Sequence, residues 1–334
     1  MSEPAEYQPE QRSRSKAVSQ MVQHLAEVAA AMRERLEACR EERDDPKVES
    51  VHHLRTGTRR VEATLETLAR EAGTRGLGEA AEEARRRWLR QLQKVRRAAG
   101  AVRDLDVHRE LLAENFLPPS DTAPDKVAAE LAYATTAAAG SDAITPLMKQ
   151  ARILDAWLKN RRTAAADALS ETLDDHAERL LRAERQFQTA TAQRRSVASR
   201  AHRTSARLAL EDYLRLVDAM PLLDRENLHD FRKGAKKARY IAESDENDPA
   251  AKAIAKTIQR VQDAIGKWHD WEVVAGEAGE ALGRDGDALR IELEERAQRA
   301  YERALRAVAT INRRLVGEWR AASPRKRTRS RPSQ

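Results

Sequence analysis

A histidine followed by basic residues at helical spacing occurs twice in the chain. The segments HHLRTGTRR and HDFRKGAKK each place a histidine and two basic residues at positions i, i+3 and i+7: His52, Arg55 and Arg59 in the first, and His229, Arg232 and Lys236 in the second. These positions share one face of an α-helix. Arginine presents a planar fork of donors that suits phosphate oxygens, and lysine presents a point charge. The spacing therefore predicts two helix faces that bind a phosphate-rich polyanion.

Further basic residues lie beside both faces. Arg60 lies at the edge of the first, and the second is flanked by Lys233, Lys237 and Arg239. Two later segments carry basic residues at i, i+4 and i+8: Arg86, Arg90 and Lys94 in one, and Lys252, Lys256 and Arg260 in the other. Basic residues one turn apart repel each other by roughly a few tenths of a kcal/mol, so acids or a bound anion should offset them. A solvated surface remains the alternative for the two later rows.

The two histidine segments belong to a longer internal match, because residues 92–107 align with residues 258–273. Two matched blocks in the same order predict a duplicated unit, with two four-helix halves related by a pseudo-twofold axis. Helices rich in Ala, Arg and Leu also resemble one another through composition, but His, Gly and Asp at fixed offsets favour duplication. Gly57 and Gly234 share one offset inside the expected helices, where glycine costs about 1 kcal/mol against alanine. We therefore expect a neighbouring helix or a ligand to come close at both glycines.

Composition and periodicity favour an all-α fold. The 334 residues include 13 Gly and 11 Pro, too few for a turn-rich β architecture. A 3.6-residue period begins at Lys16. We expect a disordered N-terminus at 1–15, a single helical domain at 16–320 with halves at about 16–140 and 143–320, and a disordered basic tail at 321–334. Helix breaks are expected at 44–46, in the loop 117–124, and after Gly100 and Gly266.

The net charge of +7 is mostly a property of the tail. Residues 323–334 hold five Arg or Lys and no acid, so the rest of the chain is near +2. A binding face outside the tail must therefore come from local clustering. The tail makes nucleic acid the main alternative partner through salt-sensitive contacts, and a general protein-interaction scaffold is a further alternative. Aromatic residues make up 4% of the chain, which argues against a base-stacking platform.

Enzymatic chemistry is not expected. The candidate metal ligands are Asp104, Asp106, His108, Asp270 and Glu272, but a two-metal site needs several converging carboxylates, and no second cluster has ligand spacing. Asp104 and Asp270 could instead cap a helix or hold the basic side chains in place. The chain has no glycine-rich phosphate loop, nucleophile elbow or metal-binding cysteine pair. We therefore expect a binding protein without a metal or cofactor.

Cys39 is the single cysteine, so the chain has no intramolecular disulfide, and we expect Cys39 to be a small buried side chain. The N-terminus has no apolar signal-peptide core, and no apolar run reaches the length of a membrane span. We expect a cytoplasmic protein without membrane contact.

These motifs resemble the CHAD family of histidine-containing α-helical domains. The family element H-x-L-R-V-x-x-R-R-L-R is similar to HHLRTGTRRVE and HDFRKGAKKAR, and the family element R-D-L-D-V stands at residues 103–107 and, degenerate, at 269–273. Glu62 departs from the pattern, because it replaces the last arginine of the first element. Some relatives carry a triphosphate-hydrolysing domain that is marked by the motif E-x-E-x-K. Only residues 292–296 come near this motif here, and they lie in a helical pattern.

The resemblance implies a compact helical bundle that binds inorganic polyphosphate and is targeted to polyphosphate granules. The expected contact set joins the two histidine faces with their neighbours: His52, Arg55, Arg59, Arg60, Lys94, Arg103, His229, Arg232, Lys233, Lys236, Lys237, Arg239 and Arg260.

Overall fold

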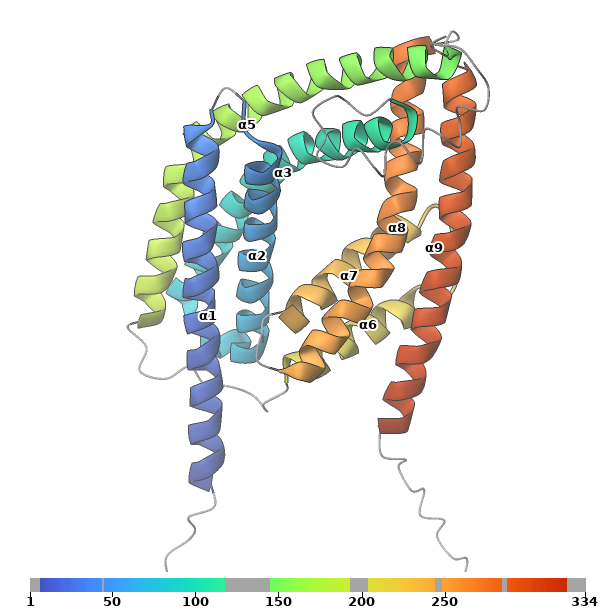
Figure 1. Cartoon of the computed structure of the whole chain (residues 1–334). Helices are drawn as coiled ribbons and strands as arrows, with labels where there is room; N and C mark the ends of the chain where they lie inside the picture. Colours follow the sequence, from blue (N-terminus) through green and yellow to red (C-terminus); the bar gives the residue numbers. More distant parts are fainter. Residues whose placement is uncertain are drawn as a thin grey trace, which may run out of the picture. The chain divides into compact units, whose positions relative to one another are not determined.

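The chain is all-helical throughout the part that the computed structural model describes, which is residues 7–43, 45–117, 145–192, 204–243, 248–283 and 287–322. No strand occurs among these residues (Figure 1). They form eight helices: α1 (Tyr7–Glu41), α2 (Val48–Gly76), α3 (Glu79–Phe116), α5 (Pro146–Ala192), α6 (Ser205–Ala219), α7 (Leu228–Glu243), α8 (Pro249–Leu282) and α9 (Asp287–Ala322). The all-α prediction is confirmed.

Local signals account for several helix ends. The chain breaks between α1 and α2 around Pro46, as predicted. Gly78 precedes α3 with φ of 77°, a left-handed conformation that glycine adopts without steric cost. Thr204 caps α6, because its hydroxyl accepts a hydrogen bond from the Arg207 amide. Asp248 does the same for the Ala250 amide at the start of α8.

The predicted breaks at Gly100 and Gly266 are wrong. α3 is continuous from Glu79 to Phe116, and α8 is continuous from Pro249 to Leu282. A helix-interior glycine costs about 1 kcal/mol, which side-chain packing along a long helix outweighs. α1 also starts at Tyr7, inside the segment 1–15 that was expected to be disordered. Pro9 lies in the first turn of that helix, where a proline removes no intrahelical hydrogen bond.

The chain divides into two compact units. The first spans Met1–Arg203 and Asp270–Ala297, and the second spans Thr204–His269 and Gln298–Gln334. The sequence placed the division near residues 140–143, but α5 belongs to the core of the first unit. Its apolar stripe, which includes Leu169 and Leu173, is buried in one cluster with residues of α1, α2 and α3.

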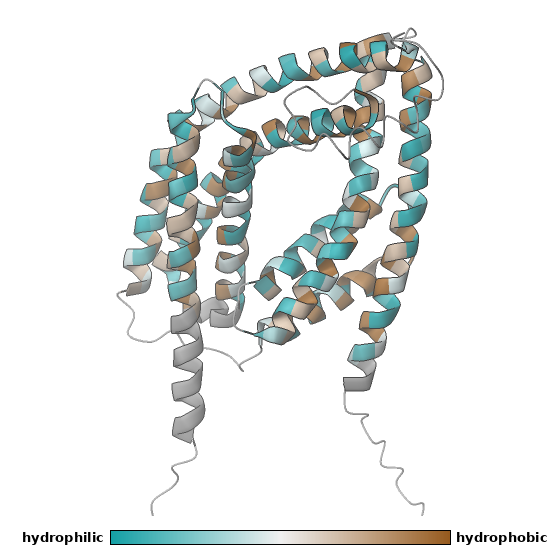
Figure 2. Cartoon of the chain, in the orientation of Figure 1, coloured by the Kyte–Doolittle hydropathy of each residue, from teal (hydrophilic) through white to brown (hydrophobic). Residues whose placement is uncertain are grey.

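The helices carry apolar residues among polar ones (Figure 2), and both units bury apolar side chains in a core. In the first unit, the rings of Trp88 of α3 and Phe187 of α5 pack with centroids 5.8 Å apart. In the second, Tyr213 of α6 packs edge-on against Phe231 of α7 at 5.9 Å. Cys39 is buried as predicted, and burial raises the pKa of its thiol to about 12.

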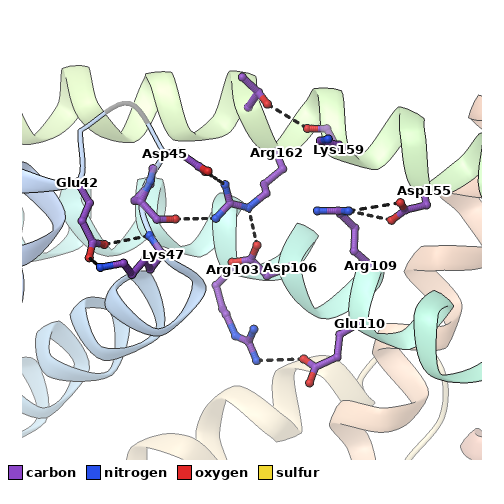
Figure 3. Close-up of polar contacts among 12 residues, drawn as sticks. Glu42, Asp45, Lys47, Arg103, Asp106, Arg109, Glu110, Asp155, Lys159 and Arg162 are labelled. Atoms are coloured by element: carbon purple, nitrogen blue, oxygen red, sulfur yellow. Dashed lines mark hydrogen bonds and ion pairs between the residues drawn. The ribbon is translucent and has the colours of Figure 1, made fainter. Parts of the chain in front are cut away.

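A buried arginine ties three segments of the first unit together (Figure 3). Arg162 of α5 donates from Nε to Asp106 of α3 at 2.6 Å. Its two terminal nitrogens donate to Asp45 Oδ1 at 2.7 Å and to the Pro46 carbonyl at 2.6 Å, both in the turn between α1 and α2. Arg162 and Asp106 are 8% and 6% exposed, so each charge depends on the other. The network holds α3 against α5 at the segment that carries the R-D-L-D-V element.

Replacing Arg162 with Met should destabilise the protein by about 3 kcal/mol, because it leaves the Asp106 carboxylate buried without its partner. Urea unfolding followed by far-UV circular dichroism measures the change. Arg161→Met is the control: Arg161 is exposed and pairs with Glu280 on the surface, so we expect a loss below about 1 kcal/mol. Equal losses in the two variants would contradict the role assigned to the buried network.

Candidate polyanion-binding site

The first basic face is built where α2 crosses α3, and it consists of His52, Arg55, Arg59, Arg60 and Arg103. The guanidinium of Arg55 lies against Gly100 of α3, so that a Cβ at Gly100 would be 3.4 Å from Arg55 Nε. Arg55 Nη2 also forms an ion pair with Asp104 Oδ1 at 3.0 Å. The missing side chain at Gly100 thus leaves room for an arginine, and the aspartate one turn later orients it.

The second basic face repeats this crossing between α7 and α8. It consists of His229, Arg232, Lys233, Lys236, Lys237 and Arg239. Arg232 lies against Gly266 even more closely, because a Cβ at Gly266 would be 2.8 Å from Arg232 Nη2. Arg232 and Gly266 hold the positions in the second sequence match that Arg55 and Gly100 hold in the first. The same contact therefore forms in both copies of the motif.

The glycines inside α2 and α7 admit a neighbouring helix, as predicted. A Cβ at Gly57 would meet Met32 Cβ of α1 at 3.4 Å, and one at Gly234 would meet Leu216 Cδ1 of α6 at 2.6 Å. Each motif helix is therefore held closely on the side of its glycine.

His52 lies within a cluster of cations. Burial and the nearby charges, of which Arg103 is the largest, lower the pKa of His52. Arg35 of α1 contributes to the same shift, and its Nη1 lies 3.5 Å from the position that a Cβ at Gly57 would occupy. Arg103 also lies 3.8 Å from Glu110 along α3 (Figure 3). Three helices therefore contribute cations around His52.

His229 has a second imidazole beside it. The ring centroids of His229 and His269 are 4.7 Å apart, and His269 occupies the position that Arg103 holds in the first copy. Burial, followed by the charges of Lys233 and Arg232, lowers the pKa of His229. Both motif histidines are therefore biased toward the neutral form, and a bound phosphate would reverse that bias.

The remaining expected contact residues differ in how far they face solvent. Arg59 and Lys236 are half-exposed, whereas Arg60, Lys237 and Arg260 are exposed. Lys233 is exposed and donates to Asp230 at 3.0 Å. Arg239 is turned toward its own helix, 4.8 Å over the Tyr240 ring and 3.4 Å from Glu243.

Lys94 lies on α3 six residues before Gly100, where Arg55 crosses. It is exposed on α3 close enough to His176 of α5 to lower the pKa of that histidine. The structure thus brings Lys94 together with α5, a neighbour that the sequence did not indicate.

Glu62, the departure from the family pattern, has a structural partner. Its carboxylate accepts a hydrogen bond from Arg96 of α3. Arg96 was missed because the second copy has Gln262 at the matched position, so the internal match gave no reason to select it. Arg35 was missed because α1 lies outside the matched blocks.

Three of the five candidate metal ligands are paired with other residues. Asp104 pairs with Arg55, Asp106 with Arg162, and His108 Nδ1 lies 2.8 Å from Glu277. Among the described residues, no three His, Cys, Asp or Glu side chains gather as they would around a metal ion. The capping role considered for Asp104 is wrong because α3 runs through this position, whereas its role in holding a basic side chain is confirmed.

The CHAD domain model matches residues 23–279, which is most of the chain. The chain belongs to the CHAD domain family. Its structure is similar to the CHAD domain from the plant Ricinus communis, with 19% identity, a TM-score of 0.59, and coverage of 89% of this chain and 91% of that one. It is also similar to PptA from Streptomyces chartreusis, with 16% identity, a TM-score of 0.57, and coverage of 87% of this chain and 99% of that one. The comparison with curated proteins found no match.

These likenesses confirm the predicted family and establish a CHAD-like fold. Within the described part of this CHAD chain, no helix is both long and apolar enough to cross a membrane.

Replacing Gly266 with Ala should stabilise α8 less than the same change at Gly276. Both glycines lie inside α8, where alanine is favoured by about 1 kcal/mol. A new Cβ at Gly266 would force Arg232 to move, whereas one at Gly276 meets nothing within 4 Å. Urea unfolding of both variants measures the difference, and an equal gain in stability would argue against the arginine–glycine contact.

Acidification should destabilise the ligand-free protein through His52 and His229. Because folding lowers both pKa values from 6.5, the unfolded chain binds more protons as the pH falls through and below about 6.5, and stability decreases. Denaturation at about pH 7.5 and about pH 5.5 should show a smaller decrease in the His52→Gln/His229→Gln variant than in the wild type. His53→Gln is the control at an exposed neighbouring position. The same decrease in stability in all three proteins would contradict this expectation.

Proposed function

We propose that this protein binds inorganic polyphosphate through its two basic faces and does not act as an enzyme. The observation that carries the proposal is the repeated crossing in which Arg55 lies on Gly100 and Arg232 lies on Gly266. Each crossing sets a guanidinium fork beside a histidine and further cations on one helix. Membership of the CHAD family supports the same ligand through the family resemblance.

The arrangement suits a linear polyanion better than a compact one. The first face places Arg55 and Arg59 one turn apart on α2, and the second places Arg232 and Lys236 one turn apart on α7. Charge-assisted hydrogen bonds to phosphate oxygens need neither a base nor a sugar. Binding should release counterions and therefore weaken as the salt concentration rises.

We further propose that the fold is an internal duplication of a four-helix unit. Helices α1, α2, α3 and α5 would form one copy, and α6, α7, α8 and α9 the other. The matched arginine–glycine crossings and the close approaches at Gly57 and Gly234 support this assignment. The pseudo-twofold relation between the copies stays a prediction.

The use of the acidic residues supports the non-catalytic part of this proposal. Carboxylates near the faces orient or neutralise arginines, as Asp104 does for Arg55 and Glu62 for Arg96. On this proposal the protein would associate with polyphosphate granules in the cytoplasm. Nucleic acid, the alternative ligand, would use the basic faces together with the basic tail, which lies outside the described residues.

The Arg55→Gln/Arg232→Gln variant should lose at least about tenfold in affinity for labelled polyphosphate, because each change removes charge-assisted hydrogen bonds worth about 1.5–3 kcal/mol. Glutamine avoids placing a second carboxylate beside Asp104. Arg87→Gln/Arg290→Gln removes the same charge from exposed arginines that pair with Glu83 and with Asp287 and Glu294, so its affinity should stay close to that of the wild type.

Competition by unlabelled DNA and RNA, on the full chain and on a chain truncated after Ala322, separates the two ligands. Polyphosphate binding that survives truncation and resists nucleic acid supports the proposal. Binding that disappears with the tail, or equal competition by nucleic acid, would refute it.

A further inference from the structure

Ion pairing along α3 changes abruptly after its third turn. Near the start of the helix every arginine faces a carboxylate of the preceding turn: Arg85 and Arg86 pair with Glu82, and Arg87 pairs with Glu83. These pairs neutralise the arginines locally, so this end of the helix is an ordinary surface of mixed charge.

Three of the next four basic residues of α3 have no such partners. Arg90, Lys94 and Arg97 are exposed, and none forms an ion pair or hydrogen bond with another residue in the part of the chain that the structure describes. Their spacing of i, i+4 and i+7 puts them on one face, where like charges repel. This row therefore differs from the paired arginines of the same helix.

Helix α5 adds two more basic groups beside this row. His176 is half-buried, and its Nδ1 is buried without a hydrogen-bond partner. Burial and then the charges of Lys94 and Arg179 lower the pKa of His176, and Asp175 opposes them. His176 is therefore within electrostatic reach of both Lys94 and Arg179. The Trp88–Phe187 contact packs α3 against α5 in the same unit.

The row leads along α3 toward the first basic face. Arg97 lies one turn before Gly100, where Arg55 crosses. From Arg90 to Gly100 the helix rises roughly 15 Å. A linear ligand bound at the crossing could therefore follow α3 toward α5.

The second copy interrupts the corresponding row. Lys252, Lys256 and Arg260 are exposed on α8, but the residue matched to Arg97 is Asp263. A carboxylate at this point repels a polyanion, so the continuous path belongs to the first copy.

We propose that Arg90, Lys94 and Arg97 of α3, together with His176 and Arg179 of α5, form an extension subsite for the polyphosphate chain. It binds the segment of polymer that lies beyond the first basic face. The inference rests on the proposed function and adds a chain-length preference to it: a chain long enough to span the helix fills both regions, whereas a short one fills the face alone.

The test compares tripolyphosphate with polyphosphate tens of phosphates long on the full chain. The Arg90→Ala/Lys94→Ala/Arg97→Ala variant should bind the long polymer about tenfold more weakly at ~0.1 M salt, and the slope of log affinity against log salt should fall by about 2. Its affinity for tripolyphosphate should be unchanged. The Arg97→Asp variant, which copies the second half, should show a smaller loss of the same kind.

The control variant removes three cations that already have carboxylate partners, Lys47, Arg87 and Arg290, each replaced by Ala. If it weakens long-chain binding as much as the test variant does, the extension subsite is refuted and net charge explains the effect. Equal losses for tripolyphosphate and the long polymer, or no loss, also refute it. If the wild type binds neither ligand, the proposed function itself fails, which distinguishes the two failures.

Discussion

The contact on which the basic faces depend is a guanidinium lying on a glycine of the adjacent helix. At Gly266 a single added carbon would lie 2.8 Å from Arg232 Nη2, and at Gly100 it would lie 3.4 Å from Arg55 Nε. The helix gives up about 1 kcal/mol at each such glycine. In return the arginine is held against backbone, its orientation limited by the partner helix. A preoriented donor fork loses less conformational entropy on binding an anion than a solvated one.

The arginines of the first unit are partly neutralised by aspartates of α3. Asp104 orients Arg55 at the surface, whereas the buried Asp106 is matched by Arg162. The two aspartates of one short motif therefore serve different ends. One orients an arginine of the first basic face, and the other fixes α3 against α5 and the α1–α2 turn (Figure 3).

The two copies of the motif share their geometry but differ in charge. The first has Arg103 beside its histidine, and the second has His269 at the matched position. In the first copy Glu62 forms an ion pair with Arg96, whereas in the second copy the matched residue, Arg239, lies over the Tyr240 ring. The repeated motif thus carries two unequal surfaces.

The sequence by itself determined the helical class, the family and the repeated arginine, histidine and glycine positions. Helical periodicity is local, so the spacing of His52, Arg55 and Arg59 already places them on one face. Glycine is unfavourable inside a helix, so Gly57 and Gly234 also predicted that another helix comes close at these positions. Met32 and Leu216 are the residues that do so.

The tertiary structure decided what is long-range. Helix α3 runs through Gly100 because packing outweighs the local cost, a balance that no local pattern reports. Arg162 pairs with Asp106 across 56 positions of the chain, and Lys94 lies within electrostatic reach of His176 on α5, which is outside the matched sequence blocks. Such pairings depend on which helices pack together. A sequence pattern encodes the face that a residue occupies, but the partner across that face appears only when the helices are assembled.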